Sequence, residues 1–87
     1  MMANQSHSNI IVYTTPTCPD CHMLKEWLTQ NAFPFEERDL TDPKIMMEAK
    51  ENTGVRVAPI TLIGEQIFYG TFASQKPKLM VALGLKT

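Results

Sequence analysis

The chain has 87 residues, of which 44 % are hydrophobic and 20 % charged, and its formal net charge is −1. This length and composition are typical of one small globular domain. The scattered basic residues give no electrostatic basis for binding nucleic acid or an anionic membrane, and the apolar runs are shorter than the roughly 18 residues that span a bilayer. Residues 1–9 are polar and lack the apolar core of a signal peptide, so we expect a flexible tail, a single domain over residues 10–87 and a cytoplasmic location.

The first two expected elements are a strand and a helix. Residues 10–14 form a short β-branched and aromatic run that is apolar on both faces, as in a central strand. Pro19 suits the first position of a helix that continues to about Gln30, which makes Cys18 the N-cap residue and places Cys21 in the first turn. Helical spacing predicts a buried face that comprises Cys21, Leu24, Trp27 and Leu28.

The middle of the chain predicts an edge strand and a second helix. Residues 35–40 are strand-like but highly charged, which suits a strand exposed at the edge of a sheet. Asp42 followed by Pro43 is a strong helix start, with an N-cap acid before proline. We expect this helix to end near Gly54, a residue that accepts the left-handed conformation common after helices.

The last part of the chain predicts a hairpin and a third helix. Residues 55–63 are expected to form a strand that contains Pro59, and residues 66–69 to return as its hairpin partner. Ser74 is expected to cap a helix that runs to about Leu83. The order β-α-β-α-β-β-α predicts an α/β fold, with a four-stranded mixed sheet flanked by three helices. The loop after the first strand then lies at the edge where open α/β sheets place their sites.

Cys18 and Cys21 are the only cysteines, and they stand at a strand-to-helix junction. In a reducing compartment, this spacing indicates a dithiol redox centre. A thiolate at the N-cap accepts first-turn N–H groups and is stabilised by the helix dipole, so we expect Cys18 to be the nucleophile. Burial one turn deeper disfavours ionisation of Cys21, which is expected to resolve the mixed disulfide. Asp20 opposes ionisation of Cys18 by only about 0.7 kcal/mol at ~6 Å in water, so the helix terminus should prevail.

Three other interpretations share these residues. Cys18 to His22 also spells C-x-x-C-H, the attachment sequence of c-type haem, which requires an exported chain and a haem pocket. A structural zinc site requires four ligands, whereas the chain has two cysteines and two histidines, one of them in the expected tail. Two incidental buried cysteines would leave their placement at a helix start beside Pro19 unexplained. We therefore predict a redox centre and no metal site.

From residue 10 to its end, the chain resembles the glutaredoxins. The matching segments, in family order, are VYTTPTCPDC (12–21), PFEERDL (34–40), TGVRVAPITLIG (53–64) and the glycine at position 70. The resemblance implies a minimal thioredoxin fold in which Pro59 follows a cis peptide bond and packs beside Cys18. It also implies that the backbone at Val57 and Ala58 pairs with the substrate, which is strand addition.

Several positions differ from the usual family pattern. Thr15 stands where glutaredoxins usually have lysine or arginine, and Asp20 stands where an aromatic residue is common. The acid that typically follows the glycine turn is absent after Gly70 and Thr71. By position, the residues that the resemblance implies for glutathione contacts are Thr15, Asp20, Gly70 and Thr71. The alanine before Pro59 is also found in glutaredoxin-like hydrogen donors of ribonucleotide reductase, which take electrons from thioredoxin reductase.

These observations predict a monomeric thiol–disulfide oxidoreductase with no tightly bound cofactor. It is expected to reduce protein disulfides or protein–glutathione mixed disulfides by a dithiol mechanism, with glutathione as co-substrate. One alternative is a thioredoxin-reductase-dependent electron donor to ribonucleotide reductase. A non-enzymatic alternative is an iron–sulfur or metal carrier that uses Cys18 together with glutathione. Neither nucleic acid nor membrane is an expected partner.

Overall fold

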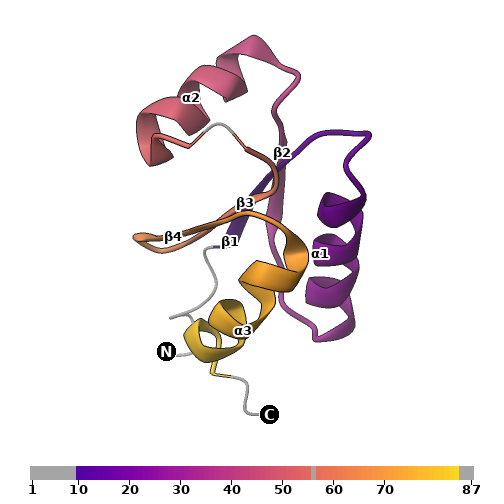
Figure 1. Ribbon diagram of the computed structural model, residues 1–87. Helices are drawn as coiled ribbons and strands as arrows, with labels where there is room; N and C mark the ends of the chain where they lie inside the picture. The colour runs from indigo at the N-terminus through magenta and orange to yellow at the C-terminus, as the bar shows by residue number, and fades with distance from the viewer. Residues whose placement is uncertain (1–9, 56, 85–87) are drawn as a thin grey trace.

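The computed structural model describes residues 10–55 and 57–84 (Figure 1). The predicted tail over residues 1–9 lies outside the described residues. The elements, in chain order, are β1 (Ile10–Thr14), α1 (Pro19–Gln30), β2 (Glu36–Asp39), α2 (Pro43–Thr53), β3 (Ile60–Ile63), β4 (Gln66–Tyr69) and α3 (Phe72–Ala82). The predicted order of elements, the mixed sheet and the three helices are confirmed.

The four strands form one sheet in the order β2-β1-β3-β4. β1 is parallel to β2 and antiparallel to β3, and β3 is antiparallel to β4. β1 is therefore central, as its apolar sequence predicts, and the charged strand β2 lies at an edge. Tyr13 of β1 pairs with Ile60 of β3, which places the residue before Ile60 at the same end of the sheet as the loop that leaves β1.

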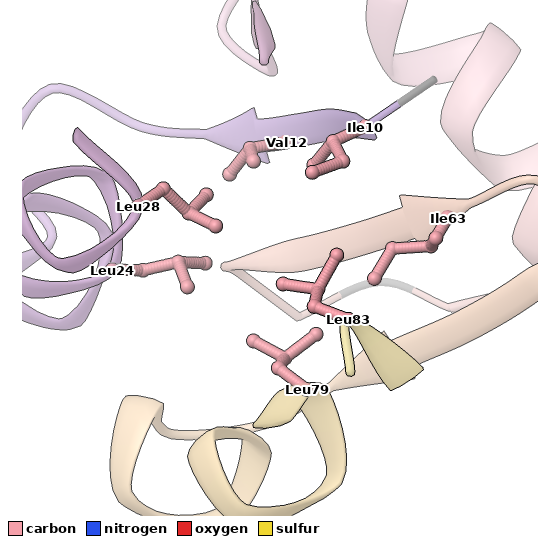
Figure 2. Close-up of a cluster of buried hydrophobic side chains, with 7 residues drawn as sticks. All are labelled: Ile10, Val12, Leu24, Leu28, Ile63, Leu79 and Leu83. Carbon is pink, nitrogen blue, oxygen red and sulfur yellow. The ribbon is translucent and has the colours of Figure 1, made fainter. Parts of the chain in front are cut away.

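The two faces of the sheet carry separate apolar clusters. On one face, side chains of β1 and β3 meet those of α1 and α3 (Figure 2), and the buried members are Ile10, Val12, Leu24, Leu28, Ile63, Leu79 and Leu83. On the other face, which α2 covers, the buried members are Tyr13, Leu40, Ala49 and Ile60. Full burial of one such aliphatic side chain contributes about 1.5–3 kcal/mol, so this packing fixes how α1 and α3 sit on the sheet.

Local signals set the ends of the first two helices. Cys18 has extended dihedral angles (φ −94°, ψ 112°) and Pro19 follows at the first helical position, so Cys18 is the N-cap residue of α1 as predicted. Asp42 caps α2 by accepting the N–H of Lys44 at 2.9 Å. Gly54 ends α2 in the left-handed region, at φ 71°.

Two predictions about the last part of the chain are wrong. The strand predicted over residues 55–63 is shorter, because β3 begins at Ile60, directly after Pro59. Proline has no N–H to donate to a sheet ladder, and the chain joins the sheet only after it. The predicted cap of the last helix, Ser74, lies inside α3; the N-cap is Thr71, whose hydroxyl accepts the Ser74 N–H at 3.1 Å.

Candidate active site

The two cysteines lie in the first turn of α1, at the carboxyl end of β1. Both thiols are free, and the Cys21 N–H donates to Cys18 Sγ at 3.2 Å. Cys18 is half-buried, whereas Cys21 is only 1 % exposed. The loop before them is closed by a hydrogen bond from the Cys18 N–H to the Thr15 carbonyl, at 3.3 Å. The accessible sulfur therefore sits at the helix terminus and the covered one behind it.

The environment of Cys21 disfavours its ionised form. Burial, and then the hydrogen bond with Cys18, raise the pKa of the Cys21 thiol to about 12. A backbone hydrogen bond with Thr15 and the charge of Lys25 act in the opposite direction but are smaller. Lys25 is itself paired with Glu37, at 2.8 Å. At neutral pH Cys21 is thus a protonated thiol until something draws its proton away.

The segment before β3 carries the proline that the resemblance singles out. The peptide bond between Ala58 and Pro59 is cis. Pro59 is buried, Ala58 is half-buried and Val57 is 47 % exposed, so the segment reaches the surface on its amino-terminal side. Because Ile60 is paired with Tyr13, this segment and the dithiol loop lie at one end of the sheet.

A buried glutamine, Gln75, holds the proline segment in place. Its side-chain amide donates to the carbonyl of Pro59 at 2.8 Å and to that of Gly70 at 3.0 Å. Its side-chain oxygen accepts the hydroxyl of Thr61 at 2.7 Å. Gln75 is 1 % exposed, and it was missed by reasoning from the sequence. Its position four residues before Leu79, on the inward face of α3, was the available signal.

The dithiol loop is tied directly to the start of α3. The carboxylate of Asp20 accepts the N–H of Phe72 at 3.1 Å. Gly70, just before α3, has φ 108°, and a Cβ added there would meet Ser74 Oγ at 3.0 Å. Of the four residues predicted to contact glutathione, the structure brings Asp20, Gly70 and Thr71 to this junction, while Thr15 lies in the loop before Cys18.

Within the described residues, those that carried the haem and zinc interpretations are not grouped as metal ligands. His22 is exposed, and its Nε2 lies 3.4 Å from the Pro16 carbonyl. Over residues 10–55 and 57–84, no group of three or more histidine, cysteine, aspartate or glutamate side chains is arranged to hold a metal ion.

In the same part of the chain, no helix is long and apolar enough to cross a bilayer.

Comparisons with known proteins agree with this geometry. The glutaredoxin family model matches residues 10–68. The glutaredoxin-like protein NrdH of Lactococcus lactis subsp. lactis is 29 % identical over 70 residues, which cover 80 % of this chain and 97 % of that protein. A crystal structure of a mutant of the thioredoxin-like protein BC3987 superposes with a TM-score of 0.80 at 28 % identity, over 88 % of this chain and 96 % of that one. NrdH-redoxin from Escherichia coli shares the fold, with a TM-score of 0.69 at 24 % identity, over 91 % and 99 % of the two chains.

A four-stranded sheet with a C-x-x-C pair at a helix start and a cis-proline before β3 defines a dithiol redox protein of the thioredoxin fold. The family match extends from β1 into β4 and thus includes both cysteines and the proline segment. The chain belongs to the glutaredoxin family. It is a thiol–disulfide oxidoreductase that acts on disulfide substrates.

Proposed function

We propose that Cys18 is the attacking nucleophile and Cys21 the resolving thiol of a dithiol mechanism. The observation that carries this assignment is the unequal burial of the two cysteines, together with the hydrogen bond from the Cys21 N–H to Cys18 Sγ. A thiolate on Cys18 accepts that N–H and lies at the positive end of the α1 dipole, and both interactions stabilise negative charge.

The reaction proceeds in two exchanges. The Cys18 thiolate attacks one sulfur of the substrate disulfide, a mixed disulfide forms, and the other substrate sulfur leaves as a thiolate that takes up a proton. Cys21 then loses its proton and attacks Cys18 Sγ, which forms the Cys18–Cys21 disulfide and releases the second substrate thiol. Two electrons pass from the dithiol to the substrate. An external reductant must return them in the same two steps reversed.

The Val57–Ala58–Pro59 segment is the proposed binding edge for the substrate backbone. Val57 is exposed, and the segment lies beside the dithiol end of the sheet. An extended substrate segment can pair with the backbone of Ala58 and so present its sulfur to Cys18, as in other cases of strand addition. This mode recognises main chain rather than a particular side chain, which suits an enzyme with several protein substrates.

The proposed electron donor is a protein reductase of the thioredoxin-reductase type, and a ribonucleotide reductase is the first substrate to test. Two observations support this choice over glutathione. The first is the similarity to NrdH proteins, one of which is described as having a thioredoxin-like activity profile. The second is that Asp20 places a carboxylate at the start of α3, where acidic glutathione would meet a like charge. We also propose that residues 10–87 act as one monomeric, cytoplasmic domain.

The test compares electron sources and cysteine variants. NADPH consumption with insulin as disulfide substrate is measured with thioredoxin reductase, and separately with glutathione plus glutathione reductase. We expect turnover with the first system and little with the second; the reverse result would assign glutathione as the donor. Cys18→Ser should abolish activity, whereas Cys21→Ser should still form a trapped mixed disulfide that mass spectrometry detects. A mixed disulfide that forms in Cys18→Ser but not in Cys21→Ser would overturn the assignment of roles.

A further inference from the structure

We propose that Asp20 makes this dithiol select its substrates by charge, so that anionic disulfides react slowly and cationic ones fast. The inference rests on the proposed role of Cys18 as nucleophile and adds the chemical class of substrate that the site accepts. In the sequence, Asp20 stands between the two cysteines, two residues after Cys18, and it is half-buried in the first turn of α1. Any group that approaches Cys18 Sγ therefore comes close to its carboxylate.

The carboxylate is held in place rather than free to turn away. It accepts the backbone N–H of Phe72 at 3.1 Å, across 52 positions of sequence. Phe72 is the first residue of α3, and its ring packs edge-on against Trp27 of α1, with ring centroids 6.0 Å apart. These contacts fix the starts of α1 and α3 together, so the carboxylate keeps one position near the first turn of α1, the turn that Cys18 caps.

Over residues 10–55 and 57–84, no side chain forms an ion pair with Asp20. Asp20 is the one acidic residue in the first turn of α1, and the first turn of α3 contains none. Lys25, one turn further along α1, is paired with Glu37, and Lys76 of α3 lies over the Phe72 ring, 5.9 Å from its centroid. The N-termini of α1 and α3 each supply about half a positive charge, and the Asp20 carboxylate offsets the positive potential that these two helix ends would otherwise present to a substrate at Cys18.

The size of the effect follows from Coulomb's law. A unit charge on the substrate at ~6 Å from the carboxylate changes the rate about threefold at the dielectric constant of water, and about tenfold if the effective constant is halved. The cationic and anionic forms of one disulfide differ by two unit charges next to the reacting sulfur. Asp20 should therefore shift the ratio of their rates about tenfold, or more, in favour of the cationic form.

The experiment measures the oxidation of the reduced protein by three small disulfides of different charge. These are cystamine (cationic), 2-hydroxyethyl disulfide (neutral) and 3,3′-dithiodipropionate (anionic), and the oxidation is followed by stopped-flow tryptophan fluorescence. Each rate is divided by the rate of the same disulfide with the uncharged thiol 2-mercaptoethanol, which removes intrinsic reactivity. The ratio of the cystamine to the dithiodipropionate value is the readout, and because it compares substrates on one protein, it cancels changes in the reactivity of Cys18.

Asp20→Asn is the test variant, since asparagine keeps an oxygen that accepts the Phe72 N–H and has nearly the same size. Glu65→Gln is the matched control, because Glu65 is exposed in the turn between β3 and β4, at the opposite end of the sheet. The ratio should be alike in the wild type and Glu65→Gln, and about tenfold lower in Asp20→Asn. High salt should reduce the wild-type ratio too, which tests the inference without a substitution.

The outcomes separate this inference from the proposed function. A ratio that Asp20→Asn leaves unchanged, or that Glu65→Gln lowers by as much, would overturn the charge selection while Cys18 remains the nucleophile. If Cys18→Ser still reacted with the same disulfides, the proposed role of Cys18 as nucleophile would be overturned instead. Glutathione disulfide, with two carboxylates and one ammonium group on each half, belongs to the disfavoured class. Its reaction should therefore be faster with Asp20→Asn than with the wild type.

Discussion

The three hydrogen bonds of Gln75 should stabilise the fold and hold the substrate-binding segment in position. Gln75→Met keeps the length of the side chain but removes its donors and its acceptor. The Pro59 carbonyl and the fully buried hydroxyl of Thr61 then lose their partner, whereas the Gly70 carbonyl is only partly buried. The variant therefore tests whether this one side chain couples α3 to the proline segment.

The expected loss of stability can be worked out from these contacts. A buried polar group left without a partner costs about 1–3 kcal/mol, so two of them cost about 2–4 kcal/mol once the structure relaxes. A domain of this length has a free energy of unfolding of roughly 4–13 kcal/mol, so the variant should still fold. The midpoint of thermal unfolding should fall by roughly 10–25 °C.

A double-mutant cycle with Thr61→Val separates the hydrogen bond from general damage to the core. In the wild type, Thr61→Val leaves the Gln75 side-chain oxygen unpaired and should cost about 1–2 kcal/mol, as measured by urea unfolding. In the Gln75→Met background the hydroxyl has already lost its partner, so the same change should be neutral or stabilising. If Thr61→Val costs the same in both backgrounds, the two side chains are not coupled and the reasoning is wrong.

Activity supplies the readout that loss of stability alone would not change. Without its donor, the Pro59 carbonyl is less firmly held, so the KM for a disulfide-containing protein should rise severalfold. Leu28→Ala is the matched control. Leu28 of α1 is fully buried against the sheet, and its truncation lowers the free energy of unfolding by a similar amount, about 2–5 kcal/mol. Both variants are assayed where circular dichroism shows them folded, and equal KM values would assign Gln75 to stability alone.

Three further predictions concern the thiols, one ion pair and one cap. Iodoacetamide at pH 8 should label Cys18 and spare Cys21, because a pKa of about 12 leaves only about one Cys21 thiol in 10⁴ ionised, as peptide mapping can show. Lys25 lowers the pKa of Glu37, so this pair stabilises the fold above the ordinary carboxyl pKa. Lys25→Met should lose less than about 1 kcal/mol in urea unfolding, because Glu37 is exposed, and this deficit should vanish as the pH falls through the lowered pKa of Glu37. Asp42→Ala should cost about 1 kcal/mol, and a loss below 0.3 kcal/mol would contradict the capping role.

The features that the sequence predicted well depend on residues close together in the chain. Cys18 could be placed at the N-cap of α1 because Pro19 directly follows it, and the start of α2 could be placed because Asp42 precedes Pro43. The central position of β1 followed from its own apolar residues. Each of these signals acts over one helical turn or one strand, where the possible conformations are few.

The features that the sequence did not predict depend on contacts between distant segments. Asp20 appeared as a charge beside Cys18, but its bond to Phe72 joins segments that only the packing of α1 and α3 brings together. Gln75 is bonded to Pro59, 16 positions earlier, and its spacing from Leu79 indicates an inward face but not which groups it binds. Ser74 and Thr71 both suit a helix cap, and the turn at Gly70 decides between them.

The chemistry of the dithiol needs both kinds of contact. The hydrogen bond from the Cys21 N–H to Cys18 Sγ is made within one helical turn, so any helix that begins with Cys-Pro-Asp-Cys can form it. Burial, however, is the largest cause of the raised pKa of Cys21, and a single helix in water cannot bury it. The same motif on an isolated helix would therefore keep an N-capping thiolate but lose the burial that contributes most to keeping Cys21 protonated. The order of the two exchanges thus depends on how the sheet and α3 cover one face of α1, and this covering is also what places Asp20 beside Phe72.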